Sequence, residues 1–222
     1  MAILASAIIT SLRSILLDPS PGVTWTDARL LSLLNEAERA VCLAKRDVFT
    51  TVANITLAAG TLQSVPTGST GIIDLYENTA GTKRRAILVD RARLDASNPA
   101  WPSDTATSIV NFWFPDARDP TRFHVSPPQV GSNSIAALYG MTPTPIAAVG
   151  SNINLPDIYE HVLKCFVLGE CYAENADRQD LGKAGYYRNE WKGLLGIGSA
   201  TQFATAQGIL PSVDPLEQQA QR

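Results

Sequence analysis

The sequence is poor in the residues that catalysis and metal binding most often use. It has two histidines and three cysteines. Cys42, Cys165 and Cys171 form no CxxC pair, and their odd number argues against a disulfide framework. All three occur in apolar helical patterns. We therefore interpret them as reduced core thiols of a protein folded in a reducing cytosol.

An excess of basic charge is also missing. The net charge is −3 and the isoelectric point is about 5.4, and this balance gives no indication of tight binding to the phosphate backbone. No apolar run is long enough to span a bilayer. Residues 1–19 lack the basic start of an export signal, and Arg13 interrupts their apolar stretch. These absences predict no membrane association and assembly inside the host cytoplasm.

Two amphipathic helices are predicted at the start of the chain, over residues 3–18 and 25–47. Thr24 is expected to cap the second helix, and Val23 to pack onto Ala28. A short turn with proline and glycine joins the helices, which predicts an antiparallel pair. The expected apolar stripes are Leu4, Ala7, Ile8, Leu12, Ile15 and Leu16 in the first helix, and Leu30, Leu34, Ala37, Val41 and Ala44 in the second.

The pattern changes to strands and turns at Phe49 and stays so to about Val149. Residues rich in Thr, Val, Ile, Tyr and Phe alternate with Gly, Pro, Asn and Asp, and the connections are short. An antiparallel sheet or small sandwich is expected, with a short helix over 90–95. The predicted strands are 50–57, 62–65, 71–78, 83–88, 108–114, 122–126 and 134–139.

Helical spacing returns at Leu155, with Pro156 in the first turn. This third helix is expected to end near Asp177, and Asp180 to cap a fourth. The expected buried residues are Ile158, Val162, Cys165, Phe166, Gly169, Tyr172 and Ala173, followed in the fourth helix by Ala184, Tyr187, Trp191 and Leu194.

The last part of the chain has few apolar residues to offset the entropy of ordering it. We expect an arm that orders only against a partner. The fold class is therefore α+β: a four-helix body made from the N- and C-terminal helix pairs, an inserted antiparallel β domain and an extended C-terminal arm. The expected domains are residues 1–48, 49–150, 151–197 and 198–222.

Sites for chemistry are weakly supported. His161 and Cys165 have helical spacing for metal ligands, but no further ligand is evident, so core thiols beside a partly exposed histidine are favoured. Alternation predicts that His124 points outward from its strand. Asp116 and Asp119 could be imagined as the carboxylates of a cell-wall hydrolase, although aspartate is also common in turns. No catalytic residue, metal site or cofactor is predicted.

One basic cluster and one aromatic run leave other interpretations open. Lys83, Arg84 and Arg85 could touch DNA, face an acidic neighbouring subunit, or form a solvated strand edge. Phe112-Trp113-Phe114 could stack on bases, although core or interface packing is favoured. A possible subunit or tail interface is assigned to Lys83, Arg84, Arg85 and Trp113.

Several stretches, taken in order, resemble the phage adaptor proteins of short-tailed bacteriophages. The similarity covers Met1 to about Leu195. The matching pieces are Leu16-Leu-Asp18, Val23-Thr-Trp-Thr-Asp27, Leu34-Asn-Glu-Ala37, Leu57-Ala-Ala-Gly-Thr61, Leu62-Gln-Ser-Val-Pro66, Leu94-Asp-Ala96, Asn98-Pro-Ala-Trp101, Asp119-Pro120, Phe123-His-Val-Ser-Pro-Pro128, Leu155-Pro-Asp-Ile-Tyr159 and Tyr172-Ala-Glu174.

The resemblance implies a structural protein of the virion neck and no enzyme. It implies a dodecameric ring between the portal and the tail nozzle or tail fibre proteins, through which genomic DNA passes during ejection without sequence-specific binding. Family members commonly dock a C-terminal arm on the portal, which matches the arm expected here. The residues assigned to portal docking are Phe203, Ile209, Leu210, Val213 and Leu216.

Overall fold

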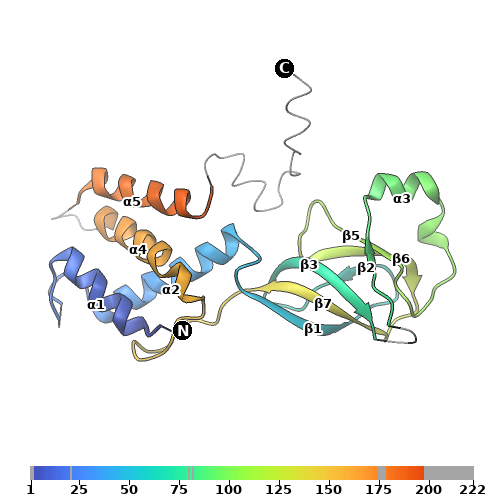
Figure 1. The fold of residues 1–222 in the computed structure, drawn as a ribbon, viewed down its shortest axis with the longest axis horizontal. Helices are drawn as coiled ribbons and strands as arrows, with labels where there is room; N and C mark the ends of the chain where they lie inside the picture. The colour runs from blue at the N-terminus through green and yellow to red at the C-terminus, as the bar shows by residue number, and fades with distance from the viewer. Residues whose placement is uncertain (1–2, 21, 80, 82, 175–178, 198–222) are drawn as a thin grey trace, which may run out of the picture. The chain divides into compact units, whose positions relative to one another are not determined.

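The structure is a computed structural model that describes residues 3–20, 22–79, 81, 83–174 and 179–197. These residues form an α+β fold of two compact units. The helical unit contains everything described up to Val48 and from Pro143 onward, and the β unit contains Phe49–Thr142. The two units are described separately below (Figure 1).

The helical unit joins both ends of the described chain. Its helices are α1 (Ala5–Leu16), α2 (Asp27–Ala44), α4 (Glu160–Glu174) and α5 (Leu181–Leu194). Helix α4 packs against α1, α2 and α5. A short 3₁₀ helix, η2 (Asp157–Tyr159), leads into α4. The sequence predicted this association because each helix carries an apolar face that needs cover.

The predicted apolar faces are confirmed for α2 and corrected for α1. Every residue of the predicted α2 stripe is buried. In α1, however, Leu4 and Ile15 are exposed, and the buried face runs through Ala5, Ile8, Ile9, Leu12 and Arg13. The stripe is rotated because α1 buries the Arg13 guanidinium together with its apolar neighbours.

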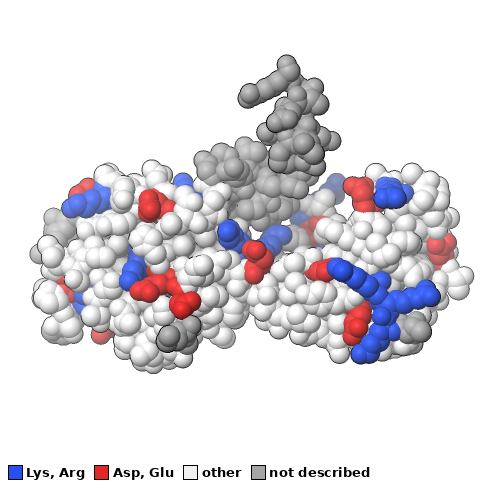
Figure 2. Space-filling model, in the orientation of Figure 1, with Lys and Arg blue, Asp and Glu red and all other residues white. Residues whose placement is uncertain are grey.

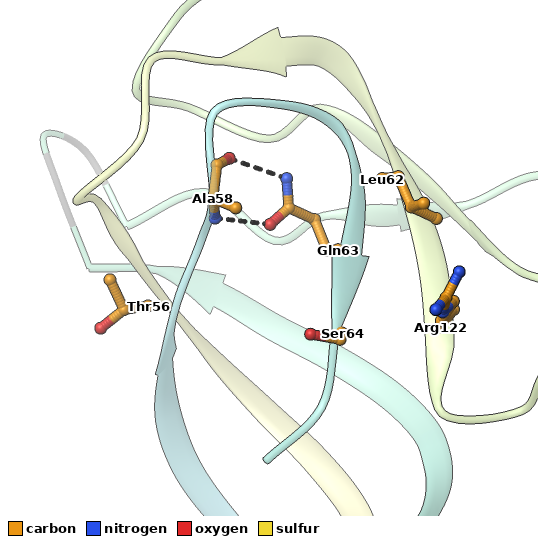
Figure 3. A pocket seen from close by; sticks show the side chains of 6 residues that line it. All are labelled: Thr56, Ala58, Leu62, Gln63, Ser64 and Arg122. Carbon is orange, nitrogen blue, oxygen red and sulfur yellow. Dashed lines mark hydrogen bonds between the residues drawn. The ribbon is translucent and has the colours of Figure 1, made fainter. Parts of the chain in front are cut away.

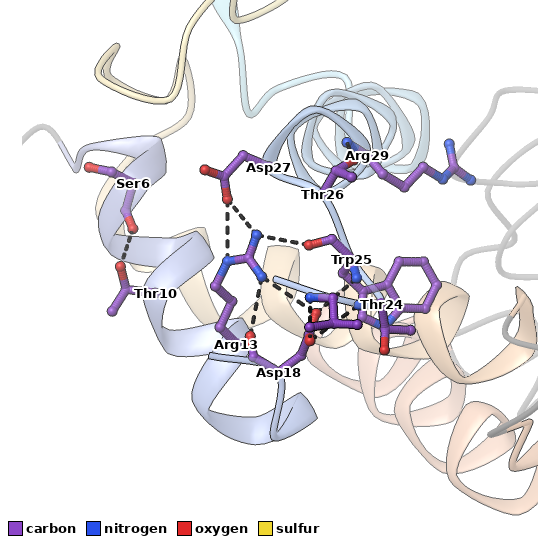
Figure 4. A network of polar contacts seen from close by, with 10 residues as sticks. Ser6, Thr10, Arg13, Asp18, Thr24, Trp25, Thr26, Asp27 and Arg29 are labelled. Carbon is purple, nitrogen blue, oxygen red and sulfur yellow. Dashed lines mark hydrogen bonds and ion pairs between the residues drawn. The ribbon is translucent and has the colours of Figure 1, made fainter. Parts of the chain in front are cut away.

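A buried ion-pair network holds the turn between α1 and α2 (Figure 4). Arg13 donates to Asp27 Oδ1 at 2.6 Å and to the Trp25 carbonyl at 2.8 Å. The Asp18 carboxylate accepts from the backbone N–H groups of Val23, Thr24 and Trp25 at 2.9, 3.2 and 2.8 Å. These contacts tie the backbone of the turn to one buried arginine–aspartate pair.

The same network corrects two expectations at the start of α2. Thr26, and not Thr24, caps the helix by accepting from Arg29 N–H. Val23 is 97% exposed and does not pack onto Ala28. Trp25 takes the buried place instead, because the carboxylate of Asp18 draws the backbone of the turn inward.

The C-terminal helices also differ in detail from the prediction. Ile158 and Leu194 are exposed, and Leu195 is buried in place of Leu194. Helix α4 begins at Glu160, later than predicted, because a 3₁₀ turn follows Pro156. Asp180 caps α5 by accepting from Lys183 N–H at 2.9 Å, as predicted.

The β unit is built from two sheets with a common core. One sheet has the order β1-β7-β3 and the other the order β2-β6-β5-β4. All pairs are antiparallel except β4 with β5, which are parallel. The strands are β1 (Thr50–Thr56), β2 (Gly60–Ser64), β3 (Ser69–Asn78), β4 (Ile87–Leu88), β5 (Phe112–Pro115), β6 (Arg122–Gln129) and β7 (Ser134–Met141).

The core between the sheets contains Leu75, Trp113, Phe123, Val125 and Ile135 among others. A smaller cluster on the outer face of β5 joins helix α3 (Arg91–Ser97) and the 3₁₀ turn η1 (Trp101–Ser103) to the sheet. Trp101 lies in this cluster and packs edge-on against Phe114. The predicted short helix is confirmed, at Arg91–Ser97.

Candidate interaction surfaces

The basic cluster lies in the exposed connection between β3 and β4, and two of its three residues are already paired with carboxylates. Lys83 pairs with Glu77 at 3.4 Å, and Arg85 pairs with Asp74 at 2.9 Å. The guanidinium of Arg84 has no ion pair within the described residues. On the visible face of this unit, Lys and Arg side chains lie beside Asp and Glu (Figure 2). The surface is therefore mixed in charge, which does not favour nucleic acid.

The strand predicted over residues 83–88 is much shorter in the structure. Asn78 donates to the Arg84 carbonyl from both its backbone N–H and its side-chain amide, each at 2.9 Å. The same Asn78 side chain exchanges hydrogen bonds with the backbone of Val110. This buried amide fixes Arg84 at the end of β3, so only Ile87 and Leu88 pair as a strand.

Core packing or a subunit or tail interface was predicted for Trp113, and the structure places it in the core. Its side chain is 2% exposed and meets Phe123 edge-on, with ring centroids 6.4 Å apart. Phe114 points to the opposite face of β5, into the cluster of Trp101 and Leu94. Because the side chains alternate and both faces of β5 are covered, this aromatic run is unavailable for stacking on bases.

An apolar groove of about 590 Å³ runs along the junction of β3 and β4. Ile73 and Leu138 line it from the first sheet, and Ile87 and Leu88 from the second. Ile87 and Leu88 are 56% and 58% exposed, although both belong to a strand. The ion pair between Arg85 and Asp74 borders the groove. Apolar walls with a charged rim are typical of a protein-binding surface.

A smaller and more polar groove lies where β1 leads into β2 (Figure 3). Its volume is about 260 Å³, and its lining includes Thr56, Ser64 and Arg122. Gln63 closes the β1–β2 turn here. Its side chain accepts from Ala58 N–H at 2.7 Å and donates to the Ala58 carbonyl at 2.9 Å. Because this buried amide bonds both backbone groups of Ala58, as a neighbouring strand would, we assign Gln63 a role in stabilising the turn.

His124 is half-buried beside a third groove, and does not point freely outward. Its ring stacks on Phe114 with centroids 5.0 Å apart, and its Nε2 atom lies 4.0 Å from Asp116 Oδ2. Burial lowers the pKa of His124. The nearby carboxylate of Asp116 raises this pKa, and the positive charge of Arg91 lowers it further. The imidazole is therefore neutral over a wider pH range than an exposed histidine. The groove that it lines has a volume of about 340 Å³.

Asp116 and Asp119 hold turn backbone. Asp116 accepts from Arg118 N–H, and Asp119 accepts from both the hydroxyl and the N–H of Thr121. The Thr121 hydroxyl and N–H lower the pKa of Asp119, and Arg122 lowers it further. A glycosidase acid requires the opposite shift. The geometry therefore favours the turn interpretation over hydrolysis.

The helical unit carries a groove of about 630 Å³ at the end of α1, with both apolar and polar residues in its lining. Ile15, Leu17 and Leu181 line it and are exposed. Leu17 has φ 54°, a left-handed conformation that usually belongs to glycine or asparagine. Tyr172 closes one side, stacked on Tyr187 with an interplanar angle of 3°.

His161 and Cys165, whose helical spacing could suit metal ligands, lie close together in the structure. Cys165 Sγ lies 3.8 Å from His161 Nε2, but no group of three metal-ligating side chains occurs in the part of the chain that the structure describes. Burial raises the pKa of Cys42 and Cys171 to about 12 and that of Cys165 to about 11. All three thiols are buried and protonated at neutral pH, as expected of core cysteines.

No described helix is long and apolar enough to cross a membrane. The residues assigned to portal docking lie outside the described part of the chain. They are Phe203, Ile209, Leu210, Val213 and Leu216.

Comparison with protein families gives a match over almost the whole chain. The family model described as SU10 adaptor protein matches residues 4–210. The chain belongs to the SU10 adaptor protein family. The SU10 adaptors are a phage adaptor family, so the chain is a bacteriophage structural protein of the head–tail adaptor type and a component of the virion. No curated protein matches the sequence.

Proposed function

We propose that this SU10 adaptor forms a ring between the portal and the tail. The resemblance to phage adaptors implies twelve copies in that ring. Membership of the adaptor family is the observation that carries the proposal. A ring needs head-to-tail contacts between different faces of the same chain. Two exposed grooves with apolar residues in their lining, one on each unit, supply candidate faces.

The C-terminal arm is the proposed portal contact. Its apolar residues are Phe203, Ile209, Leu210, Val213 and Leu216. A segment with too few apolar contacts to offset the entropy of ordering by itself can order when a partner buries its apolar side chains. Many weak arm contacts in one ring add up through avidity. The opposite side of the ring would bind tail nozzle or tail fibre proteins.

The proposed role requires that DNA pass through the ring without sticking. The chain is slightly acidic overall, and two of the three clustered basic residues already pair with carboxylates. Binding that depends on phosphate contacts would therefore be weak. The protein would act as a structural component, without catalysis or a cofactor, in the neck of a virion assembled in the host cytoplasm.

Electron microscopy of virions tests the position. Density for the ring should lie directly below the portal, and a chain absent from the neck would overturn the proposal. Deletion of Ser199–Arg222 should leave a folded protein that no longer binds purified portal. Unfolding of the truncated chain would show instead that the last residues belong to the core.

A further inference from the structure

The groove beside His124 in the β unit has a polar lining in which positive charge prevails. This polar lining comes from Arg91 of α3, Asp116 and Arg118 of the turn between β5 and β6, and His124 of β6. Two arginines and one aspartate give the lining a net charge of +1 while the imidazole is neutral. The groove is therefore suited to one monovalent anion.

Arg91 is held in position but keeps its hydrogen-bond donors. Its Nε atom lies 3.4 Å from Asp95 Oδ2. The other oxygen of Asp95 accepts from the Trp101 indole N–H at 2.8 Å, so the carboxylate that positions the arginine is itself fixed. Among the described residues, none accepts a hydrogen bond from the Arg91 guanidinium. Its N–H groups thus remain open to a ligand in the groove.

Arg118 is a cation without a counter-ion on a fixed turn. Its backbone N–H donates to Asp116 Oδ1 at 2.9 Å, and the neighbouring Arg122 pairs with Asp119 at 3.2 Å. The guanidinium of Arg118 has no ion pair or hydrogen bond in the part of the chain that the structure describes. Because the turn is already ordered, binding through Arg118 costs little backbone entropy.

His124 adds a neutral donor. Its Nδ1 atom is buried and has no hydrogen-bond partner among the described residues. An orphaned buried N–H is rarer in proteins than an unused acceptor, so we place the proton of the neutral imidazole on Nε2. Nε2 lies 4.0 Å from Asp116 Oδ2, which is beyond hydrogen-bond distance. The Nε2–H therefore remains a donor on the side of the groove that Asp116 lines.

We propose that this groove binds the carboxylate of an aspartate or glutamate side chain on a protein partner. A guanidinium presents its donors in a planar fork that matches a carboxylate. The net charge of the lining balances one carboxylate, whereas a nucleic acid would require a longer basic track. Phe114 and Pro115 supply apolar lining for the partner's methylene groups. The proposal concerns the β unit alone and does not depend on the ring or on the portal contact.

Histidine NMR of the untagged full-length chain tests the proposal. The chain has two histidines, so His161→Gln leaves His124 as the single imidazole to observe. The probe is the peptide acetyl-Gly-Glu-Gly-amide, and the matched neutral peptide has glutamine in place of glutamate. The glutamate peptide should shift the Cε1–H resonance of His124 and saturate in the millimolar range, and the glutamine peptide should not. No response to the glutamate peptide, or equal responses to both peptides, would overturn the proposal.

Two arginine variants in the same background separate the groove from general charge. Arg118→Gln should weaken binding of the glutamate peptide about fivefold. It should leave the fold intact, because Arg118 gives only its backbone N–H to the turn. Arg93→Gln is the matched control, since Arg93 is an exposed arginine of α3 outside the groove lining. Both variants remove one positive charge, so equal weakening would contradict a site in the groove.

Inorganic phosphate distinguishes the two kinds of anion. It should shift the His124 resonance only at higher concentration than the glutamate peptide does. A response to phosphate at an equal or lower concentration would assign the groove to phosphate and overturn its assignment to a carboxylate.

Discussion

The carboxylate of Glu38 on α2 accepts a hydrogen bond from the backbone N–H of Asn154 at 2.7 Å, across 116 positions of sequence. It also accepts from the Asn154 side-chain amide at 2.6 Å and from Leu155 N–H at 3.4 Å. Nearby, Asn35 bonds both the N–H and the carbonyl of Ile146. Two polar residues on one helix thus fix the segment through which the chain returns from the β unit.

Substitution of Glu38 by glutamine should destabilise the protein by about 1–3 kcal/mol, because the amide cannot satisfy all three donors and buried N–H groups are left unpaired. Glu36→Gln is the control, since that side chain is only partly buried and pairs with Arg29 at the surface, and its effect should stay within about 0.5 kcal/mol. Urea unfolding followed by circular dichroism measures both. Equal losses in the two variants would show that the Glu38 contacts do not stabilise the fold.

Asp18 should make stability depend on acid pH. The Trp25 N–H is the largest cause that lowers its pKa; burial opposes it, and the N–H groups of Val23 and Thr24 and the Arg13 guanidinium lower it further. A carboxyl with a lowered folded pKa stabilises the protein above its unfolded pKa of about 3.9, and this contribution disappears as pH falls through the folded value.

The difference in unfolding free energy between the wild type and Asp18→Asn tests this linkage. It should be about 1–3 kcal/mol at neutral pH, from hydrogen bonds to a charged acceptor, and should shrink once the pH falls below the folded pKa. A difference that stays constant from neutral to strongly acidic pH would contradict the assignment.

Leu17 should be replaceable by glycine with a gain in stability. Its φ of 54° costs a leucine about 1–2 kcal/mol, and its side chain is 81% exposed, so little packing is lost. Part of the gain is offset by the greater freedom of glycine when unfolded, which leaves about 0.5–1 kcal/mol. Ser14→Gly, inside α1, should instead destabilise by a similar amount. A lower melting temperature for Leu17→Gly would refute the prediction.

The three cysteines should resist alkylation in the folded protein. Burial raises the pKa of each well above the usual thiol value, to about 12 for Cys42 and Cys171 and about 11 for Cys165, and the thiolate is the reactive form. Iodoacetamide at mildly alkaline pH should label none of them before denaturation and all three after it. Rapid labelling of the native protein would show that one is accessible.

The sequence predicted the elements well where one simple periodicity decides them. The buried stripe of α2 and the inward positions of Phe123 and Val125 follow directly from spacing. Arg13 and Glu38 were missed as buried residues, because their partners lie in other segments and helical spacing cannot reveal them. The sequence signal for such buried charges is a charged side chain that lies inside or beside an apolar helical stripe.

The interaction surfaces were harder to predict because strand pairing decides exposure. Ile87 and Leu88 are typical core residues in composition, yet they are exposed at a sheet edge. Trp113 is the reverse case, because it lies in the core between the two sheets, while α3 and Trp101 cover the outer face of β5. The basic cluster was recognised, but its ion pairs to Asp74 and Glu77 required the register of β3.

The proposed function requires that this adaptor assembles on a portal. Native mass spectrometry of the purified full-length protein, alone and mixed with its cognate portal, measures this assembly. We expect a complex that contains one portal and a closed ring of adaptor copies. Separate masses for adaptor and portal at every mixing ratio would contradict it.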